Sequence, residues 1–179
     1  SAVNLNRLLE NLLEWSRMEQ GLIPFYPQKS KLLPLVKESI SALQDEANKK
    51  RLKIQTTISE DITIYADHHI LQSVIRNVLS NAVKFTPRDG TIKIEAREDS
   101  KNTVVSITDT GIGMDTKILN NLFKLDVRTN RNGTENEPST GLGLILCKEF
   151  VEKHNGKIWV ESEVNKGTTF YFSFPHAIT

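Results

Sequence analysis

The stretch SVIRNVLSNAVKFT, residues 73–86, places two asparagines inside an apolar helical pattern. At about 100° per residue, Asn77, Asn81 and Lys84 form a narrow stripe roughly opposite the apolar side chains. Asparagine is unfavourable within a helix because its amide competes for backbone hydrogen bonds. A solvated face is one explanation, although such faces usually carry Glu, Lys, Gln and Arg. A metal–phosphate group is the other, since amide oxygens suit Mg²⁺, and amide hydrogens and lysine suit phosphate.

The 179 residues carry a formal net charge of +1, and 38% of them are hydrophobic. This composition is typical of one globular domain with a short appendage, and it indicates no affinity for nucleic acid or an anionic membrane. The single cysteine, Cys147, lies among apolar residues, so we expect a buried side chain in a reducing compartment. No apolar run reaches the roughly 20 residues that cross a bilayer, and the first residues do not resemble a signal peptide. We therefore expect a cytoplasmic location.

Residues 3–19 are expected to form an amphipathic helix, because apolar residues recur at steps of three and four (Leu5, Leu8, Leu12 and Trp15). The apolar stripe resembles a coiled-coil seam, and its expected partner is another helix outside this sequence. Packing against its own domain stays open as the alternative. The segment 21–30 contains two prolines and is expected to be an extended linker.

Helical and strand-like segments alternate along the rest of the sequence. A second helix is expected from Pro34, which suits a first helical turn, and Asp67 is a suitable N-cap for the helix that carries the asparagines. A helix from about 142 to 154 should end at Asn155-Gly156, a left-handed C-cap. The expected strands cover 52–58, 62–66, 91–98, 103–109, 157–163 and 168–174. Because the last strands are hairpin-linked, we predict an α+β fold with a mixed or antiparallel sheet and helices on one face.

The stretch VVSITDTGIGM, residues 104–114, ends a predicted strand at Asp109 and continues with Gly111 and Gly113. Glycines let the backbone approach a ligand closely. A buried carboxylate at this position needs a donor, which the exocyclic amine of adenine would supply, whereas the carbonyl of guanine would repel it. An ordinary Asp-Gly turn after a strand is the alternative.

In STGLGLILCKEF, Gly141 and Gly143 lead into a predicted helix whose free N–H groups and dipole can hold phosphate. The polar segment 115–140 before it is long for a structureless loop, which is typical of a lid. Its Arg128 could reach a triphosphate, whereas Arg131 is interpreted as an exposed arginine.

The order and spacing of these motifs resemble the ATP-binding domain of sensor histidine kinases, in the superfamily that also contains gyrase, heat-shock chaperones and MutL. NVLSNAVKFTP resembles its N box, DTGIGM its G1 box, Phe123 in NLFKLD its F box, and TGLGLILCKEFVEKHNGKIWVES its G2 box and following strand. Gly167 in NKGTTFYFSFP fits the last glycine motif. The resemblance covers roughly residues 30–175. Residues 3–22 are also similar to the end of the dimerisation helix that precedes this domain.

The resemblance implies a two-layer α/β sandwich of the Bergerat type. It divides the chain into the end of a dimerisation helix (1–22), a linker (23–30) and a catalytic ATP-binding domain (31–179). In the family, the γ-phosphoryl group of ATP passes to a histidine on the dimerisation helices and then to an aspartate of a response regulator. A homodimer and a response regulator are the implied partners, without nucleic acid, and a membrane only through other parts of the parent protein.

The resemblance also assigns the nucleotide-binding residues. Asn77 and Asn81 face Mg²⁺ and the phosphates of ATP, Lys84 contacts phosphate, and Asp109 accepts from the adenine amino group. Phe123 anchors the lid. The other implied contacts come from the glycine boxes and the lid (Gly111, Gly113, Arg128, Thr140, Gly141, Leu142, Gly143, Leu144 and Gly167).

Superfamily members that hydrolyse ATP carry a glutamate at the position of Asn77 to activate water, and an amide cannot accept that proton. A kinase is therefore favoured over a hydrolytic ATPase, and a degenerate ATP-binding or dimerisation module is a further alternative. Ser139 replaces the glycine that usually opens the G2 box, and the sequence contains no phosphoacceptor motif. The acceptor is assigned to none of the four histidines, for which surface or capping positions are expected (His68, His69, His154 and His176).

Overall fold

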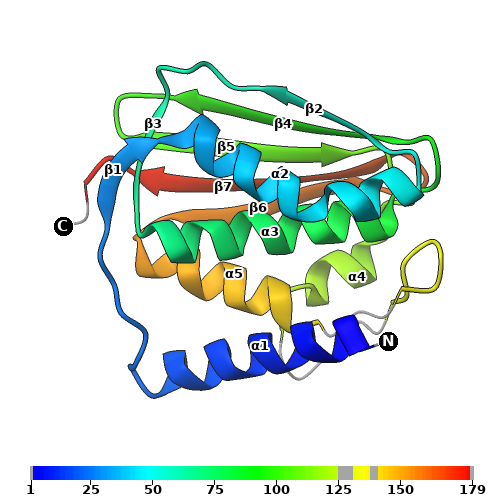
Figure 1. The fold of residues 1–179 in the computed structure, drawn as a ribbon, viewed down its shortest axis with the longest axis horizontal. Helices are drawn as coiled ribbons and strands as arrows, with labels where there is room; N and C mark the ends of the chain where they lie inside the picture. The colour runs from blue at the N-terminus through cyan, green and yellow to red at the C-terminus, as the bar shows by residue number, and fades with distance from the viewer. Residues whose placement is uncertain (1, 125–130, 138–140, 178–179) are drawn as a thin grey trace.

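The computed structural model describes residues 2–124, 131–137 and 141–177 (Figure 1). None of the helices described there is long and apolar enough to cross a bilayer. The elements follow one another as α1 (Ala2–Glu19), β1 (Gln28–Lys31), α2 (Leu32–Lys49), β2 (Lys53–Thr57), β3 (Thr63–Ala66), α3 (His68–Phe85), β4 (Thr91–Glu98), β5 (Asn102–Asp109), α4 (Thr116–Asn121), α5 (Leu142–Lys153), β6 (Lys157–Glu163) and β7 (Gly167–Pro175).

The main sheet has five strands in the order β2-β4-β5-β7-β6. β2 pairs with β4 in parallel, and all other neighbours are antiparallel. Alternation along β7 turns Phe170, Phe172 and Phe174 into the core. Helices α2, α3 and α5 cover the same face of this sheet (Figure 1). The predicted α+β class and the two-layer sandwich are therefore confirmed.

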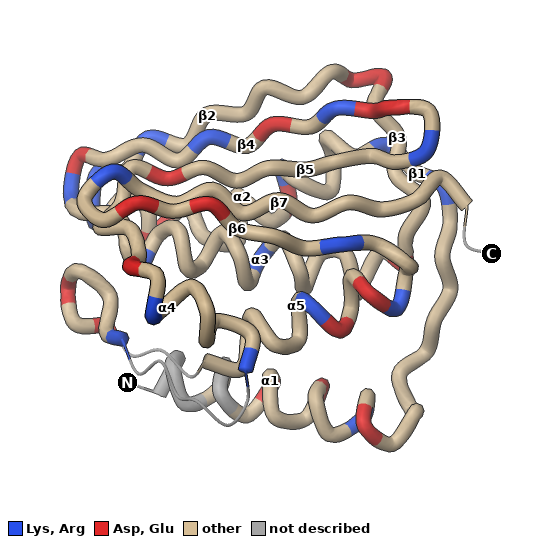
Figure 2. The backbone as a smooth tube through the Cα atoms, turned by 180° about the vertical axis from the view of Figure 1, so that it is seen from behind, with Lys and Arg blue, Asp and Glu red and all other residues tan. Residues whose placement is uncertain are grey.

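Helix α3 lies between α2 and α5, and most of its buried residues are apolar (Figure 1). Its predicted N-cap is confirmed, because the Asp67 carboxylate accepts a hydrogen bond from the Ile70 N–H. Leu71, Ile75 and Val78 are fully buried. Figure 2 shows charges of both signs spread over the sheet and helices, while α3 is almost free of them. The polar stripe of α3 therefore consists of two amides and one lysine (Asn77, Asn81 and Lys84).

Two short elements were not predicted. Gln28–Lys31 forms strand β1, which pairs with β3 in a separate two-stranded sheet, so part of the expected linker is structured. The segment QKSK has no apolar alternation that would indicate a strand. Helix α4 lies inside the expected lid, and its N-cap is Asp115, whose carboxylate accepts from the Ile118 N–H. Its six residues are too few for a helical period to be visible.

His154 ends α5 as its C-cap, and it is fully buried rather than at the surface. Its Nε2 accepts a hydrogen bond from the Asp67 N–H at 3.1 Å, and its Nδ1 lies 2.7 Å from the Phe150 carbonyl oxygen. The neutral tautomer with its proton on Nδ1 satisfies both bonds, and burial lowers the pKa of this imidazole. His154 thus joins the end of α5 to the start of α3.

Helix α1 lies against α5 (Figure 1). Trp15 and Met18 pack against the core of the domain, whereas Leu9, Leu12 and Leu13 are exposed by 50%, 40% and 56%. One edge of α1 therefore packs on its own domain, which is the alternative that the sequence left open. The leucine edge stays exposed.

We expect replacement of Trp15 by alanine to lower the free energy of unfolding by about 1–2 kcal/mol, because a half-buried indole loses its apolar contacts. Leu13→Ala is the matched control in the same helix, and its more exposed side chain should change stability by less than about 0.5 kcal/mol. Urea unfolding of both variants measures the difference. Equal effects would show that the Trp15 edge of α1 is not docked in solution.

Candidate functional site

The asparagine stripe of α3 is partly enclosed by the rest of the domain. Asn77, Asn81 and Lys84 are half-buried, while their neighbour Arg76 is exposed. The Asn77 Nδ2 lies 3.5 Å from the Ser73 Oγ, a long hydrogen bond. Within the described residues, the Asn81 side chain has no hydrogen-bond partner. A half-buried amide without a partner among the described residues is a good candidate for a ligand contact.

Asp109 is the last residue of β5 and is 6% exposed. Its Oδ1 accepts hydrogen bonds from the Gly111 N–H (2.8 Å) and the Thr168 N–H (3.2 Å). No described residue donates to its Oδ2. Burial raises the pKa of the Asp109 carboxyl to about 6, against the opposing effects of these two N–H groups and of the nearby Arg131 charge. The site thus contains a buried carboxylate with one oxygen available to a ligand.

The loop after Asp109 is fastened on both sides. The Ile112 N–H donates to the Phe85 carbonyl at the end of α3 (3.0 Å), and the Asn165 N–H donates to the Ile112 carbonyl (2.8 Å). Gly113 has φ +67°, and a Cβ there would overlap the Glu163 backbone. The predicted glycine loop therefore lies between the end of α3 and the β6–β7 turn.

Gly167 is placed directly against this loop. Its φ is +119°, and a Cβ at this position would overlap the Asp109 carbonyl oxygen. Only glycine adopts this backbone without strain. The last glycine motif and the carboxylate of the first one thus form a single structural unit.

The second glycine motif begins α5 opposite the asparagine stripe. Gly141 is the N-cap of α5 with φ +72°, and no side chain caps the helix. A Cβ on Gly143 would lie 3.0 Å from the Asn77 Oδ1. The N-terminal end of α5, which favours anions, therefore faces the Asn77 amide of α3. Leu142 is half-buried, and Leu144 packs in the core at 8% exposure.

Phe123 packs against the hydrophobic core just after α4, and the Lys148 Nζ lies 5.9 Å from its ring centroid. This position is compatible with the predicted role in anchoring the following segment. Arg128, Ser139 and Thr140 lie outside the described residues.

The interpretation of Arg131 as an exposed surface arginine is wrong. Its Nη1 donates to the Gly113 carbonyl at 2.6 Å, and its guanidinium lies 4.2 Å from the Phe85 ring centroid. Burial lowers the pKa of Arg131, and the carboxylates of Asp109 and Asp115 oppose this effect. The contact of Arg131 with the glycine loop was not predicted because no local sequence pattern indicates it. The contact depends on the fold, which brings Arg131 close to Gly113.

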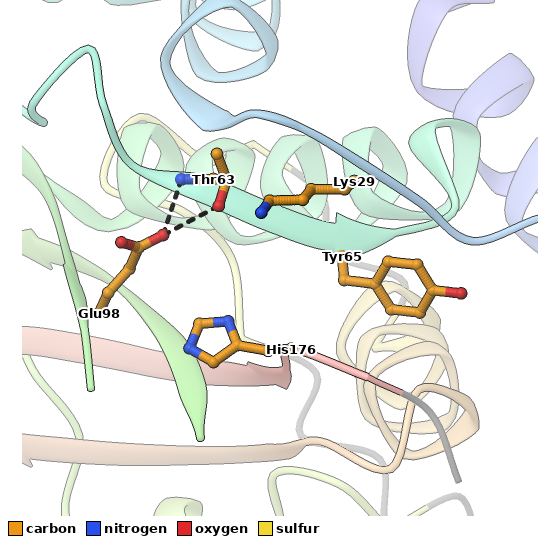
Figure 3. Close-up of a pocket in the computed structure, with 5 residues that line it drawn as sticks. All are labelled: Lys29, Thr63, Tyr65, Glu98 and His176. Carbon is orange, nitrogen blue, oxygen red and sulfur yellow. Dashed lines mark hydrogen bonds between the residues drawn. The ribbon is translucent and has the colours of Figure 1, made fainter. Parts of the chain in front are cut away.

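A separate pocket of about 280 Å³ lies at the other end of the sheet (Figure 3). There, the Glu98 Oε1 accepts from the N–H and the hydroxyl of Thr63. Asp109 ends β5 opposite Thr168, whereas this pocket lies near the opposite end of β5, where Asn102 pairs with Pro175. None of the predicted nucleotide-binding residues lines it (Lys29, Thr63, Tyr65, Glu98 and His176).

The comparisons with known proteins agree with this geometry. Residues 66–178 match the model of the family described as histidine kinase-, DNA gyrase B-, and HSP90-like ATPase. The adaptive-response sensory kinase SasA of Gloeothece citriformis (strain PCC 7424) is 35% identical over 173 residues, which are 96% of this chain and 44% of that protein. The chain thus spans less than half the length of this relative and of the SasA kinase of Synechococcus elongatus (strain ATCC 33912 / PCC 7942 / FACHB-805).

Solved kinases share the fold. The catalytic domain of histidine kinase ThkA, in a nucleotide-free form, has a TM-score of 0.73 and 27% identity, over 86% of this chain and 96% of that one. Full-length ShkA, solved in complex with AMPPNP, has a TM-score of 0.83 and 25% identity, over 98% of this chain and 36% of that one. The chain therefore belongs to the histidine kinase-, DNA gyrase B- and HSP90-like ATPase family, as an ATPase domain of the sensor histidine kinase type.

Proposed function

We propose that this chain binds Mg²⁺-ATP and presents its γ-phosphoryl group to a histidine of a dimerisation helix, for relay to an aspartate of a response regulator. One observation carries the proposal: the Asn77 amide of α3 faces the N-terminal end of α5, while the Asp109 carboxylate lies beside the glycine loop tied to the end of the same helix. The proposed site thus has two ends, both beside α3. The start of α5 would bind the phosphates at one end, and Asp109 would accept from the adenine amine at the other.

Asp109 is the residue that would select adenine. Its Oδ1 is occupied by two backbone N–H groups, so Oδ2 is the atom that would accept from an exocyclic amine. A guanine would bring a carbonyl oxygen to the same place, and a buried acceptor facing another acceptor is unfavourable. Gly111, Gly113 and Gly167 would form the wall around this carboxylate.

Asn77, Asn81 and Lys84 would hold the phosphates together with the start of α5 at Gly141 and Gly143. Their amide oxygens fit a magnesium ion, which is a hard cation that prefers oxygen ligands. Bound magnesium would neutralise phosphate charge. The lid assignments of Arg128 and Thr140 stay predictions, as do the contacts from Leu142 and Leu144 and the anchoring role of Phe123.

Asn77 also decides what this chain does with ATP. An amide cannot remove a proton from water at neutral pH, so a water molecule near the phosphates would not be activated by this side chain. The contribution of the protein would be positioning and charge neutralisation, which dominate phosphoryl transfer generally. The nucleotide should therefore be held for another acceptor rather than hydrolysed.

The domain organisation is part of the same proposal. Residues 1–22 would end a dimerisation helix, and its exposed leucine edge would pair with other helices of a homodimer. Residues 23–30 would be the linker, although its last part forms β1, and 31–179 the catalytic domain. Histidine kinase ThkA has been solved with the response regulator protein TrrA, and it shares the fold with a TM-score of 0.76 and 22% identity. A response regulator is accordingly the proposed partner here.

Calorimetry and phosphate release test the proposal. We expect the chain to bind ATP in a Mg²⁺-dependent manner and to release phosphate from it only slowly. Labelled phosphate should move from γ-labelled ATP to a separate polypeptide that carries the acceptor helices of the parent protein. Steady phosphate release by the chain alone would instead favour a hydrolytic ATPase, and binding without any transfer would favour a degenerate module.

A further inference from the structure

Lys50, which follows α2 as its C-cap, has a buried ammonium group. Its side chain is 3% exposed. The Nζ lies 2.7 Å from the Val83 carbonyl oxygen and 3.1 Å from the Lys84 carbonyl oxygen. It also lies 2.6 Å from the Thr134 Oγ1 and 3.1 Å from the Glu137 Oε1. A buried ammonium is unfavourable unless it is paired and hydrogen-bonded, and here both conditions are met.

The partners of Lys50 belong to two segments that are distant in sequence. Val83 and Lys84 are in the last turn of α3, whose carbonyl groups have no partner within the helix. Thr134 and Glu137 belong to residues 131–137, which we call the anchored loop. Lys50 thus joins the end of the phosphate-facing helix to this loop.

The anchored loop makes further bonds to itself and to α3. The Thr134 N–H donates to the Lys84 carbonyl at 2.8 Å, and the Gly133 N–H donates to the Glu137 carbonyl at 2.8 Å. The Glu135 N–H donates to the Glu137 Oε2 at 2.9 Å. The loop begins at Arg131, which reaches the Gly113 carbonyl. Both the glycine loop and the last turn of α3 are therefore tied to one small structure.

We propose that Lys50 is a positioning residue for the nucleotide site: with Thr134 and Glu137 it fixes the last turn of α3, which carries Lys84, the residue proposed to contact the phosphates. This inference rests on the proposed function, since it concerns the same site. The Lys84 carbonyl accepts from both Lys50 and Thr134, so the backbone of the phosphate-binding residue is held at its own peptide group. Because its Nζ is surrounded by four protein oxygen atoms, Lys50 itself would not contact the nucleotide.

Two substitutions separate positioning from simple electrostatics. Lys50→Met removes a positive charge, and Glu137→Gln removes a negative charge while keeping the shape of the side chain. If Lys50 acted on the triphosphate only through its charge, the two variants would change ATP affinity in opposite directions. If the pair positions the last turn of α3, both variants should weaken binding.

The matched control is Lys49→Met, which makes the same chemical change at the adjacent, exposed position. Each variant is titrated with Mg²⁺-ATP and with adenosine, and amide hydrogen exchange of residues 131–137 is measured without nucleotide. We expect Lys50→Met and Glu137→Gln to lose about tenfold in Mg²⁺-ATP affinity and to keep their adenosine affinity. Exchange at Gly133, Thr134 and Glu135 should become faster in both. Lys49→Met should match the unmodified protein.

Opposite changes in ATP affinity, or unchanged exchange and affinity in both variants, would overturn the proposal. An equal loss for adenosine would also overturn it, because the effect would then not concern the phosphate side. Glu137 is partly exposed on a loop, so Glu137→Gln decides the question even if Lys50→Met does not fold. Failure of the unmodified protein to bind Mg²⁺-ATP would contradict the proposed function, and the exchange measurement would still report whether Lys50 anchors the loop.

Discussion

Replacement of Asp109 by asparagine is expected to reduce the affinity for adenosine and ATP about 100-fold while making the protein more stable at neutral pH. The Oδ1 of Asp109 must accept from the backbone N–H groups of Gly111 and Thr168. An asparagine would keep its oxygen there and turn its NH₂ group to the place of Oδ2. That NH₂ would face the exocyclic amine of adenine, so a charged acceptor is replaced by a second donor, which costs a few kcal/mol.

The stability effect has the opposite sign because the buried carboxylate is unfavourable in its charged form. The pKa of Asp109 rises from an ordinary 3.8 to about 6 in the folded protein. The folded state therefore binds this proton more tightly than the unfolded state. The stability that protonation of Asp109 contributes is fully present below pH 3.8 and is lost as the pH rises through about 6. At pH 7.5 the charged group destabilises the fold by roughly 2–3 kcal/mol, and asparagine, which resembles the protonated form, avoids this.

Urea unfolding at pH 4 and pH 7.5 tests the stability effect, and adenosine titrations test the binding effect. Asp109→Asn should gain stability over the unmodified protein at pH 7.5 and little at pH 4. Adenosine carries no phosphate that titrates in this range, so its affinity for the unmodified protein should fall as the pH drops through about 6. Asp45→Asn, at an exposed position on α2, is the matched control and should change neither quantity. Unchanged adenosine affinity in Asp109→Asn would remove Asp109 from the site.

Sequence patterns predicted those parts of the fold that depend on local periodicity. The asparagine helix, its Asp67 cap and the strands that carry the glycine motifs formed as expected, because their apolar faces alone decide which side is buried. The same patterns explain why Asn77 and Gly143 meet: one lies on the polar stripe of α3 and the other at the start of the adjacent α5. Their roles in binding stay predictions.

The features that sequence patterns missed depend on long-range contacts. In the sequence, Lys50 is one more lysine at a helix end, and only the fold brings Thr134 and Glu137 to its ammonium group. In the sequence, Arg131 resembles an ordinary loop arginine, whereas in the structure it donates to the Gly113 carbonyl of the glycine loop. In both cases the fold, and no local property, determines burial. Polar residues that acquire partners from distant segments are therefore the ones that a motif search misses in this chain.

Replacement of Asn81 by alanine should weaken Mg²⁺-ATP binding by about 10- to 100-fold without changing adenosine affinity. The Asn81 amide is half-buried and has no hydrogen-bond partner among the described residues, so its removal breaks no hydrogen bond among them. Alanine also has a higher helix propensity than asparagine, by about 0.5 kcal/mol, so the variant should be at least as stable as the unmodified protein. A loss of binding therefore cannot be attributed to unfolding.

Magnesium removal separates the two roles that the Asn81 amide could play. If its oxygen binds the metal, chelation of Mg²⁺ should abolish the difference in ATP affinity between Asn81→Ala and the unmodified protein. If its hydrogens bind phosphate directly, the difference should persist in the chelator. Asn48→Ala, at an exposed position on α2, is the control for the substitution itself and should bind as the unmodified protein does. Unchanged Mg²⁺-ATP affinity in Asn81→Ala would show that the stripe is an ordinary solvated face. The proposed binding of phosphate by α3 would then be wrong.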